Sequence, residues 1–159
     1  MTSLVDTNTV VYASQNALDG SPAFPNLVRW LTERKPFVSA VSMEEALRWQ
    51  RLRYDDKRAE RRSLLEFFNR AEIEGRLLSL TTQIESLAAT FTVPPWNVAR
   101  NDALIAATAA DAGCVLVTAD VGGNSRLNRL NAVPGVSVIT YPYSDLEFIF
   151  GLWLVSGTP

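Results

Sequence analysis

Residues 101–120 decide the fold, and they read NDALIAATAADAGCVLVTAD. Asn101 can cap a helix that runs to Ala112, and Gly113 stands just past its end, where helices commonly stop. The apolar run from Val115 to Val117 follows at once and is typical of a buried strand. A helix followed directly by an apolar strand indicates a parallel sheet that is covered by helices on both faces.

The same alternation continues towards both ends of the chain. Further apolar strands are predicted at residues 2–6, 37–39, 77–80 and 136–139. Helices are predicted at residues 9–16, 24–34, 59–74 and 83–91, and another begins near Ser42. We therefore predict an α/β fold, a three-layer α/β/α sandwich with a mainly parallel central sheet, in one domain that spans residues 1–159. Its core is expected at about residues 2–140, followed by a C-terminal extension at about 141–159.

The composition narrows the possible chemistry. The chain has 159 residues, of which 47% are hydrophobic, so it suits one folded domain. It has no histidine, which excludes Ser-His-Asp triads, Cys-His nucleophilic sites and histidine-bearing zinc sites. Its one cysteine, Cys114, excludes an intrachain disulfide and reads as a small apolar core residue. The net charge of −2 gives no global attraction to nucleic acid, so such binding would need a local basic patch.

The two ends of the chain show no membrane signal. The first strand begins almost at once and carries Asp6, so no signal peptide is visible. The apolar tail at 146–155 is shorter than the about 20 residues that a membrane-spanning helix needs. We therefore expect a soluble cytoplasmic protein. The residues after Tyr141 could add a core element, a dimer contact or a docking surface for a partner.

Four carboxylates stand where a predicted strand ends or a helix begins: Asp6, Glu45, Asp102 and Asp120. Taken singly, each has a structural explanation. Asp6 can be a helix N-cap, and Asp102 can interact with a helix dipole. Asp120 can open a loop, and Glu45 can close a capping box with Ser42. Together they are expected at one edge of the sheet, because functional groups in open α/β sheets gather at the carboxyl ends of the strands.

Clustered carboxylates repel one another unless a cation lies between them. Mg²⁺ and Mn²⁺ prefer oxygen ligands, and one or two such ions beside a phosphate can activate a water and stabilise the leaving oxygen. This chemistry needs no histidine. The leading hypothesis from the residues is therefore metal-assisted cleavage of a phosphodiester.

These motifs resemble those of PIN-domain ribonucleases, and more closely those of the VapC-like toxins of bacterial type II toxin–antitoxin pairs. Asp6-Thr7-Asn8 resembles the opening acid motif of that family. The stretch from Ser39 to Glu45 resembles its Ser-x-x-Thr/Ser-x-x-Glu helix start. The stretch from Asp102 to Ala107 resembles its third-acid helix, and Thr118-Ala119-Asp120 resembles its final Thr-x-Asp. The resemblance runs from Leu4 to about Ile139.

The resemblance implies a Mg²⁺- or Mn²⁺-dependent endoribonuclease that acts on RNA, is paired with a cognate antitoxin protein and forms a homodimer. The four carboxylates would then surround one or two metal ions. Thr118 would orient Asp6 through its hydroxyl, and Asn8 would lie near the metal waters or the substrate. Asn124 stands where some members carry another acid, which leaves the number of metal ions open.

The segment 48–62 is strongly basic, with seven Lys or Arg residues against three Asp or Glu residues. Because it follows Glu45 closely, it could guide an RNA backbone towards the acids, or it could dock an acidic antitoxin tail. The other interpretation is a solvated helix face with internal ion pairs. The predicted contact residues are Arg48, Arg51, Arg53 and Arg58.

Other functions fit a similar fold. The chain could be a PIN-like module that has lost metal binding and acts only by binding RNA or protein. A phosphohydrolase that works through an aspartyl-phosphate is a weaker alternative, because position 8 is Asn where such sites want a second acid. A dinucleotide-binding domain is disfavoured, since no Gly-x-Gly-x-x-Gly follows the first strand. If the nuclease hypothesis holds, Asp6→Asn or Asp102→Asn should abolish cleavage and leave the fold intact or more stable, because repulsion among the acids is relieved.

Overall fold

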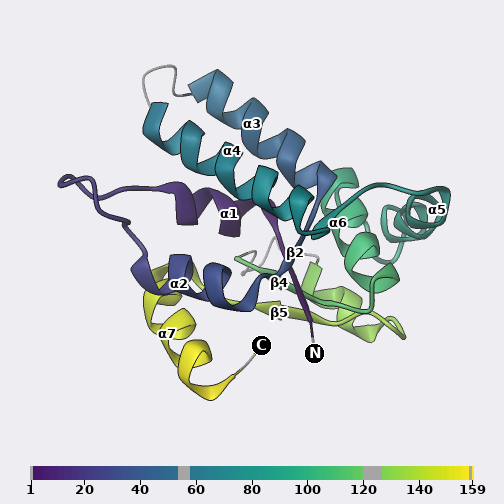
Figure 1. Ribbon diagram of the computed structural model, residues 1–159. Helices are drawn as coiled ribbons and strands as arrows, with labels where there is room; N and C mark the ends of the chain where they lie inside the picture. The colour runs from purple at the N-terminus through teal and green to yellow at the C-terminus, as the bar shows by residue number, and fades with distance from the viewer. Residues whose placement is uncertain (1, 54–57, 120–126, 158) are drawn as a thin grey trace.

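The computed structural model describes residues 2–53, 58–119, 127–157 and 159. Its centre is a five-stranded sheet in the order β3-β2-β1-β4-β5, in which every pair of neighbours is parallel. The strands are β1 Ser3–Val5, β2 Phe37–Ser39, β3 Leu77–Leu78, β4 Val115–Thr118 and β5 Val138–Thr140. Helices pack on both faces of the sheet (Figure 1), so the predicted three-layer α/β/α sandwich is confirmed.

The helices of the described residues follow the predicted order. They are α1 Thr7–Ser14, α2 Pro25–Arg34, α3 Ala40–Arg53, α4 Arg58–Ile73, α5 Thr82–Phe91, α6 Arg100–Asp111 and α7 Leu146–Ser156. Two 3-10 turns, η1 Leu127–Ala132 and η2 Tyr143–Asp145, lie before and after β5. Strand β3 is shorter than predicted, because the chain turns away after Leu78 to reach Thr81, the N-cap of α5.

Two apolar clusters fill the space between the sheet and its helices. Alternate residues of a strand point to opposite faces, so the central strands supply both clusters. Leu4 and Leu116 pack with residues of α5 and α6. Val5 and Val117 pack with residues of α1, α2, α4 and α7. Burial of each such side chain contributes about 1.5–3 kcal/mol, so the central strands are firmly held between the helical layers.

The strand order reverses beside β1. From β1 the chain builds β2 and β3 on one side, and it then returns to place β4 and β5 on the other side. Val5, at the end of β1, is paired with Val117 of β4. Asp6 directly follows β1, and Thr118 is the last residue of β4. Ligands of open α/β sheets bind at such a reversal, outside the carboxyl ends of the strands.

The start of α3 differs from the prediction. The helix begins at Ala40, directly after β2, so Ser42 lies within it and is buried. The hydroxyl of Ser39 accepts a hydrogen bond of 3.1 Å from the N–H of Val41 and so satisfies one of the first donors of the helix. The predicted capping box between Ser42 and Glu45 is therefore wrong, and both side chains are available for contacts with other elements.

Two further helix starts are also shifted. Helix α1 begins at Thr7, before the predicted Thr9, because Asp6 is its N-cap. Helix α6 has Ala99 as its N-cap, so Asn101 lies inside the first turn and is not the predicted cap. The side chain of Asn101 instead contacts another helix, as described below.

The last helix, α7, packs beside α2 (Figure 1). The rings of Trp30 and Phe150 meet edge to face with their centroids 5.0 Å apart, and Tyr141 meets Phe150 at the same distance. All three rings are buried, so the residues after β5 extend the second apolar cluster. Among the described residues, no helix has the length and apolar character needed to cross a membrane.

Candidate active site at the carboxyl edge of the sheet

Asp6 is held at the end of β1 by donors from its own helix and from the neighbouring strand. Its Oδ1 accepts hydrogen bonds from the N–H of Thr9 at 3.0 Å and from the hydroxyl of Thr9 at 2.6 Å. Its Oδ2 accepts a hydrogen bond of 2.5 Å from the hydroxyl of Thr118, which is the contact that the resemblance implied. The side chain is buried, and these charge-assisted bonds offset the cost of removing a carboxylate from water.

Glu45 reaches the same edge from the second turn of α3. Its Oε1 accepts a hydrogen bond of 2.6 Å from the hydroxyl of Thr7, and its Oε2 accepts one of 3.1 Å from the side-chain amide of Asn101. The hydroxyl of Thr7 also lies 3.0 Å from the hydroxyl of Ser42. Glu45 is half-buried, and its carboxylate therefore joins three helices, α1, α3 and α6.

These contacts bring the surroundings of three predicted acids together. Thr7 is the neighbour of Asp6, and Asn101 is the neighbour of Asp102, which is half-buried in the first turn of α6. The residues that the structure describes contain no group of three or more acidic side chains arranged to hold a metal ion. Asp120 and Asn124 lie outside the described residues. Asn8 is exposed in the first turn of α1.

The negative charge of Asp6 affects two nearby tyrosines. Burial raises the pKa of the Tyr141 phenol far above its usual range, and the charge of Asp6 raises it further. Burial also raises the pKa of Tyr12, again with a smaller contribution from Asp6. Both phenols therefore stay protonated at neutral pH and act there as neutral hydrogen-bonding groups.

Sequence reasoning did not identify Thr7, Thr9 and Tyr141 as parts of this site, and it gave Asn101 only a capping role. The spacing of Asp6 and Thr9 was a usable signal, because an N-cap residue commonly bonds to the N–H three positions on. Tyr141 lies 132 positions from Thr9, and no local pattern links two such residues.

The predicted basic contact residues are only partly described. Arg48 is exposed on α3 and forms an ion pair of 2.5 Å with Glu44, one turn before it. This pair fits the interpretation of a solvated helix face at this position. For Arg51, Arg53 and Arg58 the structure describes the backbone alone.

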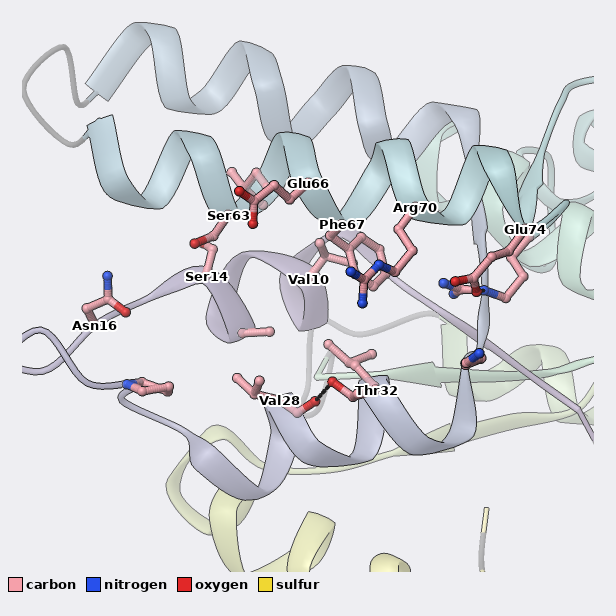
Figure 2. A pocket seen from close by; sticks show the side chains of 16 residues that line it. Val10, Ser14, Asn16, Val28, Thr32, Ser63, Glu66, Phe67, Arg70 and Glu74 are labelled. Carbon is pink, nitrogen blue, oxygen red and sulfur yellow. Dashed lines mark hydrogen bonds and ion pairs between the residues drawn. The ribbon is translucent and has the colours of Figure 1, made fainter.

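A groove of about 490 Å³ lies between α1, α2 and α4. Val10 belongs both to its lining and to α1, the helix that Asp6 caps. Figure 2 shows Val28 and Thr32 on α2 facing Phe67 and Arg70 on α4 across the groove. The lining combines apolar side chains with charged side chains of both signs, some of them on α4.

Comparisons with known proteins agree with this fold. The chain is similar to the solved structure of VapBC2 from Rickettsia felis bound to a DNA fragment from their promoter, with 17% identity and a TM-score of 0.59 over 89% of this chain and 99% of that chain. It is also similar to FitAcB from Neisseria gonorrhoeae, with 20% identity and a TM-score of 0.58 over 86% of this chain and 96% of that chain. For VapBC-5 from Mycobacterium tuberculosis, the identity is 19% and the TM-score 0.56, over 88% of this chain and 98% of that chain.

At these identities the solved structures show a shared fold. No curated protein sequence matches the chain at a significant level. The family model of the PIN domain matches residues 3–128, a range that includes the strands β1 to β4 and all four predicted acids. The parallel sheet, the reversal beside β1 and the match over most of the chain agree, and the chain belongs to the PIN domain family.

Proposed function

We propose that this PIN domain is a Mg²⁺- or Mn²⁺-dependent endoribonuclease and the toxin of a toxin–antitoxin pair. The observation that carries the proposal is the network at the carboxyl edge of the sheet. Asp6 is buried at the strand reversal, and Glu45 contacts Thr7 and Asn101, which are the chain neighbours of Asp6 and Asp102. A buried carboxylate fixed by hydroxyl and amide donors is typical of a site that binds a hard cation.

The side-chain atoms that could bind a metal ion here suit magnesium or manganese. They are oxygen atoms, and the sequence has no histidine that would favour zinc. Asp6, Glu45, Asp102 and Asp120 would hold one or two ions. A bound ion would lower the pKa of a water, so that a nucleophile forms near neutral pH. The residues around the carboxylates would orient them and would place the RNA phosphate beside them.

The test is cleavage of a mixed RNA pool by the purified protein with Mg²⁺, with Mn²⁺ and with EDTA. Asp102→Asn should abolish cleavage, because it removes a proposed metal ligand. Asp111→Asn is the matched control, since Asp111 is exposed at the other end of the same helix. Equal cleavage by wild type and Asp102→Asn would refute the assignment of Asp102, and cleavage that persists in EDTA would refute the metal mechanism.

A PIN-like module that only binds its partners is the alternative. Titration with Mn²⁺ separates it from the nuclease, because an inert module should bind no ion through these carboxylates. A folded protein that binds Mn²⁺ but cuts no RNA in the pool would point to a narrow RNA target. A folded protein that neither binds Mn²⁺ nor cuts RNA would support the binding module.

We also propose that the groove between α1, α2 and α4 receives a segment of the antitoxin. The similar structures from Rickettsia felis and Mycobacterium tuberculosis are of VapBC pairs, and another similar structure is a toxin–antitoxin complex from Klebsiella pneumoniae. A groove lined by both apolar and charged side chains suits an amphipathic segment of a partner. Binding there would act on α1, which begins at Asp6.

A pair of substitutions on α4 tests this docking. Phe67→Glu places a charge in the groove and should weaken the complex with the cognate antitoxin by at least about tenfold, because an apolar contact is lost and a charge is buried. Leu65→Glu is the control, since Leu65 is exposed on the same helix and does not line the groove. Equal affinities of the two variants would refute the proposed docking place.

A further inference from the structure

A line of hydrogen bonds connects the end of β5 to Asp6. Tyr141 follows β5, and its N–H donates a hydrogen bond of 3.0 Å to the carbonyl of Thr118. Its ring is fully buried against Phe150, and its hydroxyl lies 2.5 Å from the hydroxyl oxygen of Thr9. Thr9 in turn contacts Asp6. The backbone hydrogen bond and the packing of the ring therefore fix the position of the Tyr141 hydroxyl, which is linked through Thr9 to Asp6, the proposed metal ligand.

The direction of these hydrogen bonds follows from the number of protons. A carboxylate can only accept, so the hydroxyl of Thr9 donates its single proton to Oδ1 of Asp6. The hydrogen bond between Thr9 and Tyr141 must then use the proton of Tyr141, with the Thr9 oxygen as acceptor. The order of donation is Tyr141 to Thr9 to Asp6.

We propose that Tyr141 is a positioning residue for Asp6, and that it acts through the hydroxyl of Thr9. By donating to Thr9, Tyr141 keeps the Thr9 proton directed at Oδ1, where the N–H of Thr9 also donates. Thr118 holds Oδ2 from the other side, so the plane of the carboxylate is fixed before a cation arrives. This inference rests on the proposed metal-dependent function of the site.

The buried phenol is suited to this role. Burial and the charge of Asp6 raise the pKa of Tyr141, so that it remains a donor throughout the pH range in which a nuclease is assayed. The donation from Tyr141 occupies a lone pair of the Thr9 oxygen, so it restrains the orientation of that hydroxyl, and without it the Thr9 hydroxyl is held by one contact fewer. The simpler explanation is that Thr9 only satisfies a buried Tyr hydroxyl. A double-mutant cycle distinguishes the two.

The experiment is calorimetric titration of Mn²⁺ into wild type, Tyr141→Phe, Thr9→Val and the double variant. Tyr141→Phe keeps the buried ring and should weaken Mn²⁺ binding by about tenfold, as the loss of a residue that supports a metal ligand commonly does. Thr9→Val should weaken it at least as much. In the Thr9→Val background, Tyr141→Phe should have no further effect, because the line of donation is already broken.

Two controls separate positioning from general damage. Thr9→Ser retains the hydroxyl and should keep the wild-type affinity for Mn²⁺, whereas a packing defect would persist in it. Tyr143→Phe removes an exposed phenol hydroxyl two positions on and should change nothing. In cleavage assays, Tyr141→Phe should raise the Mn²⁺ concentration needed for half-maximal rate and leave the KM for RNA unchanged.

The possible failures have different meanings. Wild-type affinity in Tyr141→Phe, or additive effects in the double variant, would overturn the role of Tyr141 and leave the nuclease proposal standing. A folded wild type that binds no Mn²⁺ would overturn the proposed function, and the role of Tyr141 would fall with it. Unfolding transitions of all variants show which of them are folded.

Discussion

Asp6 and Glu45 lie at the same edge of the sheet, but the protein holds them in different ways. Asp6 is buried, and the donors described for it are on Thr9 and Thr118. Thr9 lies in the helix that Asp6 caps, and Thr118 lies in the strand that pairs with β1. Glu45 is half-buried, and its donors are the side chains of Thr7 and Asn101 on two other helices. The position of Asp6 therefore follows from the sheet, whereas that of Glu45 depends on how three helices pack. We expect Asp6 to be the less adjustable of the two.

The largest effect is expected for Asp6→Asn. Loss of a metal ligand and its charge should reduce RNA cleavage by roughly a thousandfold or more, since a metal ion contributes several kcal/mol to the stability of the transition state. The structure also changes the stability expected from the sequence. Asparagine can still cap α1 through its oxygen, but its NH₂ group cannot accept the hydrogen bond from Thr118, so the variant should lose about 1–2 kcal/mol of unfolding free energy rather than gain any.

Cleavage rates and urea unfolding measure the two parts of this prediction. Asp19→Asn is the control for the loss of one negative charge, because Asp19 is exposed in a turn and its described hydrogen bonds are with Ser21, outside the site. An unchanged or increased unfolding free energy in Asp6→Asn would show that repulsion among the acids outweighs the hydrogen bonds that Asp6 accepts.

Glu45→Gln should be the next most damaging change for activity and should cost little stability. The amide keeps one oxygen that can accept from Thr7 or Asn101, but it loses the charge that a metal ion requires. We expect cleavage to fall by more than about a hundredfold, beyond the range usual for residues that only support a ligand. Glu44→Gln is a closely matched control, since Glu44 is exposed and paired only with Arg48 in the described contacts. Similar cleavage by both variants would remove Glu45 from the site.

Local sequence patterns predicted the elements around Asp6, but they did not predict the start of α3, the helix that carries Glu45. The prediction of a strand at residues 2–6, with Asp6 at its end, required only local patterns, and so did the prediction of a helix and a strand between Asn101 and Asp120. The start of α3 was wrong because Ser42 and Glu45 have the spacing of a capping box. In the structure, the hydroxyl of Ser39 accepts the hydrogen bond at the start of α3, and the hydroxyl of Ser42 contacts that of Thr7 on α1. A local pattern cannot show which tertiary partner will take a side chain.

Asn101→Ala tests whether Glu45 depends on packing between helices. The change removes the amide that donates to Oε2 of Glu45, and Thr7 still donates to Oε1. We expect cleavage to fall by about tenfold through a weaker affinity for Mn²⁺, as for other partners of metal ligands. Stability should change by less than about 1.5 kcal/mol, the usual contribution of one hydrogen bond. If Mn²⁺ affinity is unchanged, Thr7 alone suffices to hold Glu45.

The smallest effect concerns Tyr141 and stability at high pH. Its raised pKa means that the folded state keeps this proton at pH values where the unfolded tyrosine, with a pKa of about 10, has lost it. The contribution is complete below pH 10 and is lost as pH rises above it, with a slope of about 1.4 kcal/mol per pH unit. Tyr141→Phe removes this slope, and Tyr12 contributes equally to both proteins. Urea unfolding between about pH 9 and 11 should therefore show the advantage of wild type over the variant shrinking as pH rises. A constant difference would mean that Tyr141 ionises alike in both states, and that its proton is not held by the contact with Thr9.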